Sequence, residues 1–383
     1  MTLTADTIPG TIADVREQFG VWLHENSDRL RELCAPGQDV AATFTAQREL
    51  QKLLFDSGWI RLGWPAELGG LGGEMVLRAV VVEELCSAGY PPPFSFGTQE
   101  VLGPAIARYA PPELAADLLP RLLSGSEYWC QGFSEPGAGS DLASLRCKAV
   151  EDGDDWVISG EKVWTSWAQV ADRCLLLART GEPNSGSRGI TALMMDMDTP
   201  GIDLRPLVSM NGDAEFCSLY LDDVRIPRSR TLGEIGGGWA VAMTILASER
   251  GAAAWQRQTW MRARLHDLLK QAPDLPPAVA GEAFELIHAL RLLSRRTVHA
   301  LSRGEDIGAT PSFDKLLMST AEKFLFAAAL EHLGSATLFD DDPTSAGWRN
   351  DYLYSRASSI YGGAAEIQRD IIAGRILRLP GRR

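Results

Sequence analysis

The order of the hydrophobic patterns along the chain constrains its fold more than any other feature. From Thr11 to about Glu127, apolar residues recur at spacings of three and four, which is typical of helices that face a core. Between about Tyr128 and Leu232, short apolar runs are separated by turn-rich clusters, which indicates strands joined by hairpins. Helical spacing returns after the triple glycine at 236–238 and continues to the C-terminus. Because helices and strands do not alternate, this order predicts an α+β protein rather than a doubly wound sheet.

The length of the chain implies more than one domain. At 383 residues, it exceeds what a single hydrophobic core usually organises. We expect an N-terminal α-helical domain over residues 1–127, a barrel-like antiparallel β domain over 128–233, and a C-terminal helical domain over 234–383. The glycine-rich segment 63–73 breaks the first helical region. We interpret it as a connection between helices, with a phosphate-cradling loop as the alternative.

The composition disfavours several classes of partner. A formal net charge of −13 argues against nucleic acids and anionic membranes, and an anionic ligand would need local donors. No apolar stretch is long enough and free enough of charge to span a bilayer. The first ten residues lack the basic and apolar regions of a secretion signal. The six cysteines have neither zinc-finger nor redox spacing, so we interpret them as buried thiols of a cytoplasmic protein that holds no metal.

The densest functional signal lies in two segments of the predicted β region, 131–141 (QGFSEPGAGSD) and 160–166 (GEKVWTS). The first ends a strand-like run in a turn whose glycines let the backbone approach a ligand closely. The second places Trp164 between small polar residues, which suits a flat aromatic ligand that needs an apolar wall and several hydrogen-bond donors. Either motif alone is better explained by core aromatics beside a surface turn. Together, they resemble the flavin-binding middle domain of the acyl-CoA dehydrogenase family, and the resemblance extends over almost the whole chain.

This resemblance implies the acyl-CoA dehydrogenase fold, with a C-terminal four-helix bundle, and FAD as the cofactor. The isoalloxazine would meet the Ser134 hydroxyl, Trp164 would cover one of its faces, and Thr165 and Ser166 would donate to its polar rim. Ser140 would lie near the pyrophosphates of FAD and coenzyme A. The residues that the resemblance assigns to the cofactor in the middle domain are Gln131, Gly132, Phe133, Ser134, Ser140, Trp164, Thr165 and Ser166.

A single carboxylate in an apolar helix is the candidate catalytic base. Glu249 follows the apolar run 239–247, where a charged group is costly unless it is paired or functional. Burial raises the pKa of such a carboxyl group, which suits a general base that works near neutrality. An ion pair made only for packing is the alternative. The resembled family has its catalytic glutamate either in a C-terminal Tyr-Glu-Gly segment, where this chain has Gly362, or in the first long helix after the β domain. The resemblance therefore assigns the base to Glu249.

The C-terminal motif 361–369 completes the expected site. Its two glycines precede a predicted helix, whose first N–H groups can stabilise developing negative charge. The resemblance implies that the Gly362 N–H and a flavin ribityl hydroxyl hold the thioester carbonyl, and that flavin N5 accepts the hydride. It places Gly363, Arg250 and Ser140 at the acyl-CoA substrate, although Arg250 equally fits a salt bridge. The further residues that it assigns to the cofactor are Tyr361, Ala364 and Glu366.

The chain departs from the family where one subunit normally contacts the flavin of its neighbour. The segment 270–281 lacks the family's Arg-x-x-Phe-Gly motif, a glutamine is replaced by Glu331, and a threonine is replaced by Ala364. A carboxylate near a pyrophosphate is unfavourable because like charges repel. These departures predict an α2β2 complex with a paralogous subunit, as in actinobacterial degradation of sterol side chains, with a homotetramer as the alternative.

The resemblance thus implies α,β-dehydrogenation of a bulky or branched acyl-CoA, with electrons passed to an electron-transferring flavoprotein. Glycine at 362 vacates space near the reacting carbons, which agrees with a bulky substrate. Two alternatives stay open from the sequence. One is a dehydrogenase whose acyl group is attached to a carrier protein. The other is a catalytically silent subunit that stabilises an active relative.

Overall fold

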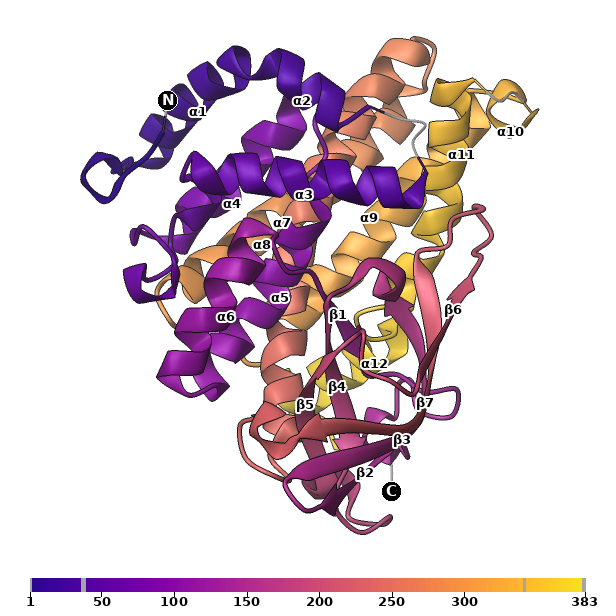
Figure 1. Cartoon of the computed structure of the whole chain (residues 1–383). Coiled ribbons are helices and arrows are strands. Elements are labelled where there is room, and N and C mark those ends of the chain that lie inside the picture. Colours follow the sequence, from indigo (N-terminus) through magenta and orange to yellow (C-terminus); the bar gives the residue numbers. More distant parts are fainter. Residues whose placement is uncertain (1, 36–38, 340–341, 381–383) are drawn as a thin grey trace.

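The computed structural model describes residues 2–35, 39–339 and 342–380, which form a sheet beside two groups of helices (Figure 1). The first helices are α1 (Ile12–Glu25), α2 (Ser27–Leu33), α3 (Val40–Asp56), α4 (Met75–Ser87), α5 (Phe94–Tyr109) and α6 (Pro112–Ser124). The strands are β1 (Trp129–Gly132), β2 (Lys148–Asp152), β3 (Asp155–Ser166), β4 (Arg173–Arg179), β5 (Ile190–Asp196), β6 (Ile202–Leu207), β7 (Phe216–Pro227) and β8 (Thr231–Leu232). The last helices are α7 (Gly238–Gln271), α8 (Pro277–Ser302), α9 (Pro311–His332), α10 (Ala336–Phe339), α11 (Pro343–Ser355) and α12 (Ala365–Ile371).

The first long helix shows how local sequence sets the N-terminal fold. α1 begins with a reciprocal cap, in which the Asp14 N–H donates to the Thr11 hydroxyl and the Thr11 N–H donates to the Asp14 carboxylate. Its apolar face buries Phe19 and Trp22, whose ring centroids lie 5.3 Å apart. Trp59 packs edge-on against Phe19 at 4.9 Å. The predicted helical spacing therefore corresponds to a buried aromatic core.

A buried carboxylate joins the N-terminal helices to the C-terminal ones. Glu83 of α4 is 3% exposed and accepts from Arg16 of α1 at 3.3 Å. It also accepts from Arg262 of α7 at 2.8 Å and from Arg291 of α8 at 2.6 Å. Three guanidinium groups satisfy one carboxylate that would otherwise be costly to bury. Four helices that are far apart in the sequence are thereby fixed to one another.

The strands form one sheet in the order β6-β7-β3-β2-β4-β5-β8, with β1 paired to β4 beside this path. Most neighbouring strands are antiparallel, as predicted, but β1 and β2 both run parallel to β4. Local turn patterns cannot predict the pairing of β1 with β4, because the paired Trp129 and Arg173 are far apart in the sequence. Along β4, Leu175 and Leu177 join the core beneath the helices, whereas Leu176 belongs to the core on the other face. Both faces of the sheet are therefore covered.

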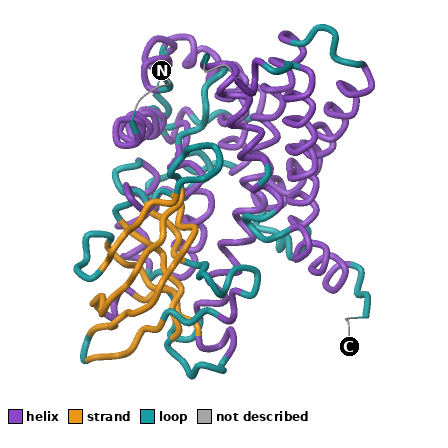
Figure 2. The backbone as a smooth tube through the Cα atoms, turned by 90° about the vertical axis from the view of Figure 1, so that its right-hand side faces the viewer, coloured by secondary structure: helices purple, strands orange, loops and turns teal. Residues whose placement is uncertain are grey.

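The C-terminal helices confirm the predicted helical domain. α7 is 34 residues long and packs against α5, α8 and α9, and α9 also packs against α11. The sequence predicts helix breaks at 272–277, 304–311 and 340–343. In the structure, the first two connections span residues 272–276 and 303–310, within one residue of the predicted breaks. Residues 340 and 341 of the third lie outside the described residues. In side view, the strands gather below and beside the helices, so helices, sheet and helices form one α+β architecture (Figure 2).

The structure bears on two expectations from composition, that the cysteines are buried thiols and that no segment spans a membrane. All six cysteines are free, and five of them are buried, which confirms the predicted buried thiols. Burial raises the pKa of Cys147 to about 11, so this thiol stays protonated near neutrality. Among the residues that the structure describes, no helix is both long enough and apolar enough to cross a membrane.

Candidate active site

The two motifs of the β region lie side by side. The Ser134 carbonyl at the end of β1 accepts from the Val163 N–H at 3.0 Å, which joins segment 131–134 to the end of β3. The pairing of β3 with β7 shifts register between Lys162 and Thr165. This irregularity gives Trp164 a φ of 61° and leaves it 61% exposed. A bulky residue in the left-handed region marks local strain, which is characteristic of functional sites.

A buried ion pair fixes the turn that follows β1. Lys162 is fully buried and donates to the Glu135 carboxylate at 2.8 Å and to the Phe133 carbonyl at 3.1 Å. The N–H groups of Arg146 and Cys147 donate to the same carboxylate at 2.7 and 2.9 Å. Burial alone would raise the pKa of Glu135, but Lys162 and these two donors lower it. The turn is therefore rigidly supported, a feature that the sequence motifs did not reveal.

The residues around the Trp164 ring fit a flat ligand with a polar rim, which is the chemistry of the flavin ring. Thr165 is fully buried, yet its hydroxyl has no hydrogen-bond partner among the described residues. A buried hydroxyl without a partner is costly, so this atom indicates a ligand that would satisfy it. Trp164 contacts Phe216 edge-on, with ring centroids 5.8 Å apart, and leaves most of its surface free for stacking. Ser134 and Ser166 are partly buried.

The other residues predicted to bind the cofactor lie in several different environments. A side chain on Gly132 would meet Leu176 and Cys174 at 2.8 and 2.9 Å, so close packing of β1 on β4 accounts for this glycine. Phe133 is buried in the core beneath the helices, while Gln131 is partly buried and Ser140 is exposed on the turn. Ala364 precedes α12 without a side-chain cap, and Glu366 is exposed and lies 3.7 Å from Arg369.

The candidate base and the C-terminal glycine turn meet. A side chain on Gly362, which has a φ of 62°, would lie 2.9 Å from the Glu249 Oε1 atom. Within the described parts of the chain, the Glu249 carboxylate makes no hydrogen bond or ion pair. Burial raises the pKa of Glu249, while Lys315 and Arg250 oppose this rise. A free carboxylate in such surroundings is suited to accept a proton, and its lack of a partner disfavours a purely structural ion pair.

The turn also presents free backbone donors. Neither the Gly362 N–H nor the Gly363 N–H has an acceptor among residues 2–35, 39–339 and 342–380. The Arg250 Nε lies 3.5 Å from the Gly362 carbonyl, and Gln368 donates to the Gly363 carbonyl at 3.3 Å. Arg250 thus contacts the turn, and no carboxylate lies within ion-pair distance of it in the described structure. A proton acceptor and unpaired N–H donors converge here, which is the requirement for removing a proton next to a carbonyl.

Two charged residues near the site, a buried lysine and a partly buried glutamate, were missed in the sequence. Lys315 of α9 is 4% exposed and donates to the Ser358 carbonyl at 2.7 Å. A charged residue beside the apolar run 316–318 is a signal that could have identified it. Glu215 lies just before β7, and burial raises its pKa to about 7, against the hydrogen bonds of the Ser166 and Tyr354 hydroxyls. No sequence pattern singles out Glu215.

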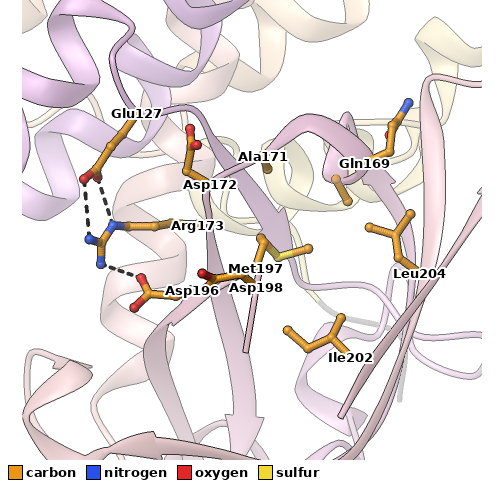
Figure 3. A pocket seen from close by; sticks show the side chains of 11 residues that line it. Glu127, Gln169, Ala171, Asp172, Arg173, Asp196, Met197, Asp198, Ile202 and Leu204 are labelled. Atoms are coloured by element: carbon orange, nitrogen blue, oxygen red, sulfur yellow. Dashed lines mark hydrogen bonds and ion pairs between the residues drawn. The ribbon is translucent and has the colours of Figure 1, made fainter. Parts of the chain in front are cut away.

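A separate cavity in the β region has unsuitable chemistry for this reaction. It has a volume of about 590 Å³, and Figure 3 shows carboxylates around Arg173. Arg173 is already paired with Glu127 at 2.9 Å and with Asp196 at 2.7 Å. None of the predicted site residues lines this cavity. The convergence of Glu249 with the glycine turn therefore identifies the candidate active site.

Comparisons with known proteins identify one family over most of the chain. Three family models match it in order: acyl-CoA dehydrogenase N-terminal domain at residues 28–126, middle domain at 130–224 and C-terminal domain at 281–377. Acyl-CoA dehydrogenase IpdE1 of Mycobacterium tuberculosis is 35% identical, and the match covers 96% of this chain and 98% of that protein.

Solved structures share the same architecture. The Tcur3481-Tcur3483 steroid ACAD superposes with a TM-score of 0.82 at 30% identity, and the match covers 97% of each chain. A chain of the ChsE4-ChsE5 complex from Mycobacterium tuberculosis superposes with a TM-score of 0.82 at 28% identity, covering 98% of this chain and 99% of that one. Both of these structural neighbours are heteromeric.

Proposed function

Because the chain belongs to the acyl-CoA dehydrogenase family, we propose that it oxidises the bond between the α- and β-carbons of an acyl-CoA thioester with Glu249 as the base. Acyl-CoA dehydrogenases are FAD flavoproteins. When bound, FAD supplies the acceptor for the hydrogen and electron pair that leave the β-carbon. The side chains that would hold it are those around Trp164, with the buried Thr165 hydroxyl as a donor.

The single observation that carries the proposal is the unpaired Glu249 carboxylate against Gly362. Glu249 would take the α-proton, because its oxygens are free and its raised pKa makes it a stronger base than an exposed glutamate. The free Gly362 N–H would stabilise the negative charge that develops on the thioester oxygen. Burial from bulk water strengthens both interactions.

Basic side chains beside the turn of residues 135–141 support coenzyme A as the carrier. A cavity of about 800 Å³ lies beside the segment 144–151 that follows this turn, and Arg146 and Lys148 are among its lining residues. The net charge of −13 would repel an anionic ligand, so such local cations are needed. We assign the phosphate-bearing part of coenzyme A to this cavity.

A heteromeric assembly accounts for the departures from the family pattern. Glu331 is exposed on the last turn of α9, and the segment 270–281, which lacks the Arg-x-x-Phe-Gly motif, contains the connection between α7 and α8. Structural neighbours of this chain are themselves complexes of two different subunits. We propose an α2β2 complex with a paralogous subunit, located in the cytoplasm, that acts on a bulky or sterol-derived acyl-CoA and passes electrons to an electron-transferring flavoprotein. A fully flavin-loaded, active homotetramer of this chain alone, measured by native mass, would contradict it.

The base is tested by Glu249→Gln, with the exposed Glu282→Gln on α8 as the matched control. The Glu249 variant should keep the flavin absorbance of the purified complex and lose at least about 1000-fold of its turnover with an acyl-CoA panel. The Glu282 variant should behave as the wild type. Retained turnover in the Glu249 variant would refute the assignment. If the enzyme turned over only acyl groups attached to a carrier protein, that protein would be the acyl carrier in place of coenzyme A.

A further inference from the structure

A buried lysine faces the proposed base across the glycine turn. The Lys315 Nζ atom donates to the Ser358 carbonyl at 2.7 Å and lies 3.9 Å from the centre of the Tyr361 ring. A side chain on Gly362 would lie 3.6 Å from Nζ and 2.9 Å from the Glu249 Oε1 atom. Lys315 and Glu249 therefore approach the same small volume from α9 and α7.

Lys315, Glu249 and Arg250 are the charged groups of the site that make no ion pair with a described residue. Lys315 makes no ion pair with any described residue, and neither does Glu249. Arg257, the next cation along α7 toward Lys315, is paired with Glu322 of α9. A lone buried charge is costly, so a lone cation beside a lone carboxylate indicates that each offsets the other through space.

We propose that Lys315 is a positioning residue of the dehydrogenation site, which keeps Glu249 ionised without touching it and holds the turn that carries Gly362. This inference rests on the proposed function, because it takes Glu249 as the base. A direct ion pair would occupy the carboxylate oxygens that must accept the α-proton. A cation that lies close to the carboxylate without contacting it favours the charged form and leaves those oxygens free.

The charges around the base agree with this role. Burial raises the pKa of Glu249, and Lys315 opposes the rise more strongly than Arg250 does. Burial lowers the pKa of Lys315 to about 8, while Glu249 raises it and Arg250 and Arg257 lower it further. Tyr361 faces the same space, and burial raises its pKa above the ordinary value, so its hydroxyl stays neutral. Lys315 is therefore the main group that favours ionised Glu249.

The test compares Lys315→Met with Lys323→Met, which makes the same change at an exposed position of the same helix. Both are measured in the flavin-loaded enzyme, purified in the assembly it forms. The acidic limb of the kcat/KM profile should move to higher pH by about one unit or more in the Lys315 variant, since removing a nearby opposite charge raises a carboxyl pKa by that much. The Lys323 variant should keep the wild-type limb. Lys315→Arg should also keep it, because the charge is retained.

Flavin absorbance and the thermal midpoint separate this role from simple packing. A Lys315→Met enzyme with a lower midpoint and an unmoved acidic limb would overturn the proposal. If both Lys315→Met and Lys315→Gln failed to fold while Lys315→Arg folded, the cation would be required for packing, and the proposal would also be overturned. Retained turnover in Glu249→Gln would instead refute the proposed base. An inactive Glu249→Gln with an unmoved limb in Lys315→Met would refute only the role of Lys315.

Discussion

Replacing Gly362 with alanine would test how closely the glycine turn sets the position of Glu249, the proposed base. At a φ of 62°, a residue with a Cβ atom costs about 1–2 kcal/mol. Gly304, between α8 and α9, has a φ of 67° and open space around it, so Gly304→Ala carries the same backbone cost alone. We therefore expect both variants to lose about 1–2 kcal/mol of unfolding free energy in chemical denaturation.

Only the Gly362 variant should also lose catalysis. Its new methyl group would lie 2.9 Å from the Glu249 Oε1 atom, which is the mobile end of a flexible side chain and must move away. A displacement of about 1 Å at a reacting group costs on the order of 100-fold in rate, or about 2.7 kcal/mol of transition-state stabilisation. We expect kcat/KM to fall by about that factor in Gly362→Ala and to be unchanged in Gly304→Ala. Equal kcat/KM values in the two variants would refute the reasoning.

Two further substitutions test the structure away from the base. Asp314 is fully buried, and burial raises its pKa from 3.8 to about 6, so the wild type loses up to about 3 kcal/mol of stability as pH rises through that range. Asp314→Asn should match the wild type near pH 4 and have the higher thermal midpoint at pH 8; equal midpoints at pH 8 would contradict this. Trp164→Ala should weaken FAD binding about tenfold with little change in thermal midpoint, because the exposed ring contacts mainly Phe216. Titration of the flavin-free protein measures this, and unchanged affinity would remove Trp164 from the cofactor site.

The helices and their ends could be predicted because the sequence patterns that mark them are local. The predicted breaks end at Pro277 and Pro311, and these prolines are the first residues of α8 and α9. The glycine-rich segment 63–73 is a loop, as interpreted, and it closes on itself through the Gly63 N–H to the Gly72 carbonyl at 2.7 Å. A side chain on Gly70 would meet the Trp64 carbonyl at 1.8 Å, so packing accounts for that glycine and nothing in the loop requires a phosphate.

The rest of the site depends on contacts between distant segments. Lys162 and Glu135 form a buried pair although 27 positions separate them, and neither lies in a pattern that predicts the other. Gly132 shows the opposite problem. Its motif predicted that the backbone approaches a ligand closely there, whereas the structure explains this glycine by the packing of β1 on β4. Glu249 could be singled out because a charge in an apolar run is visible in the sequence. Its relation to Lys315 could not, since it arises only when α7 and α9 pack together.

The proposed base, Glu249, lies on the long helix α7, and this has a consequence for selectivity. Glu249 lies about three turns from the start of a 34-residue rod that is braced by α5, α8 and α9. Because α7 is packed on several sides, its backbone holds Glu249 in place. The carboxylate therefore changes position by rotation about the bonds of its own side chain. Under the proposed function, the acyl group therefore has to reach Glu249, and the depth to which an acyl chain enters would decide whether its α-carbon lies next to the carboxylate.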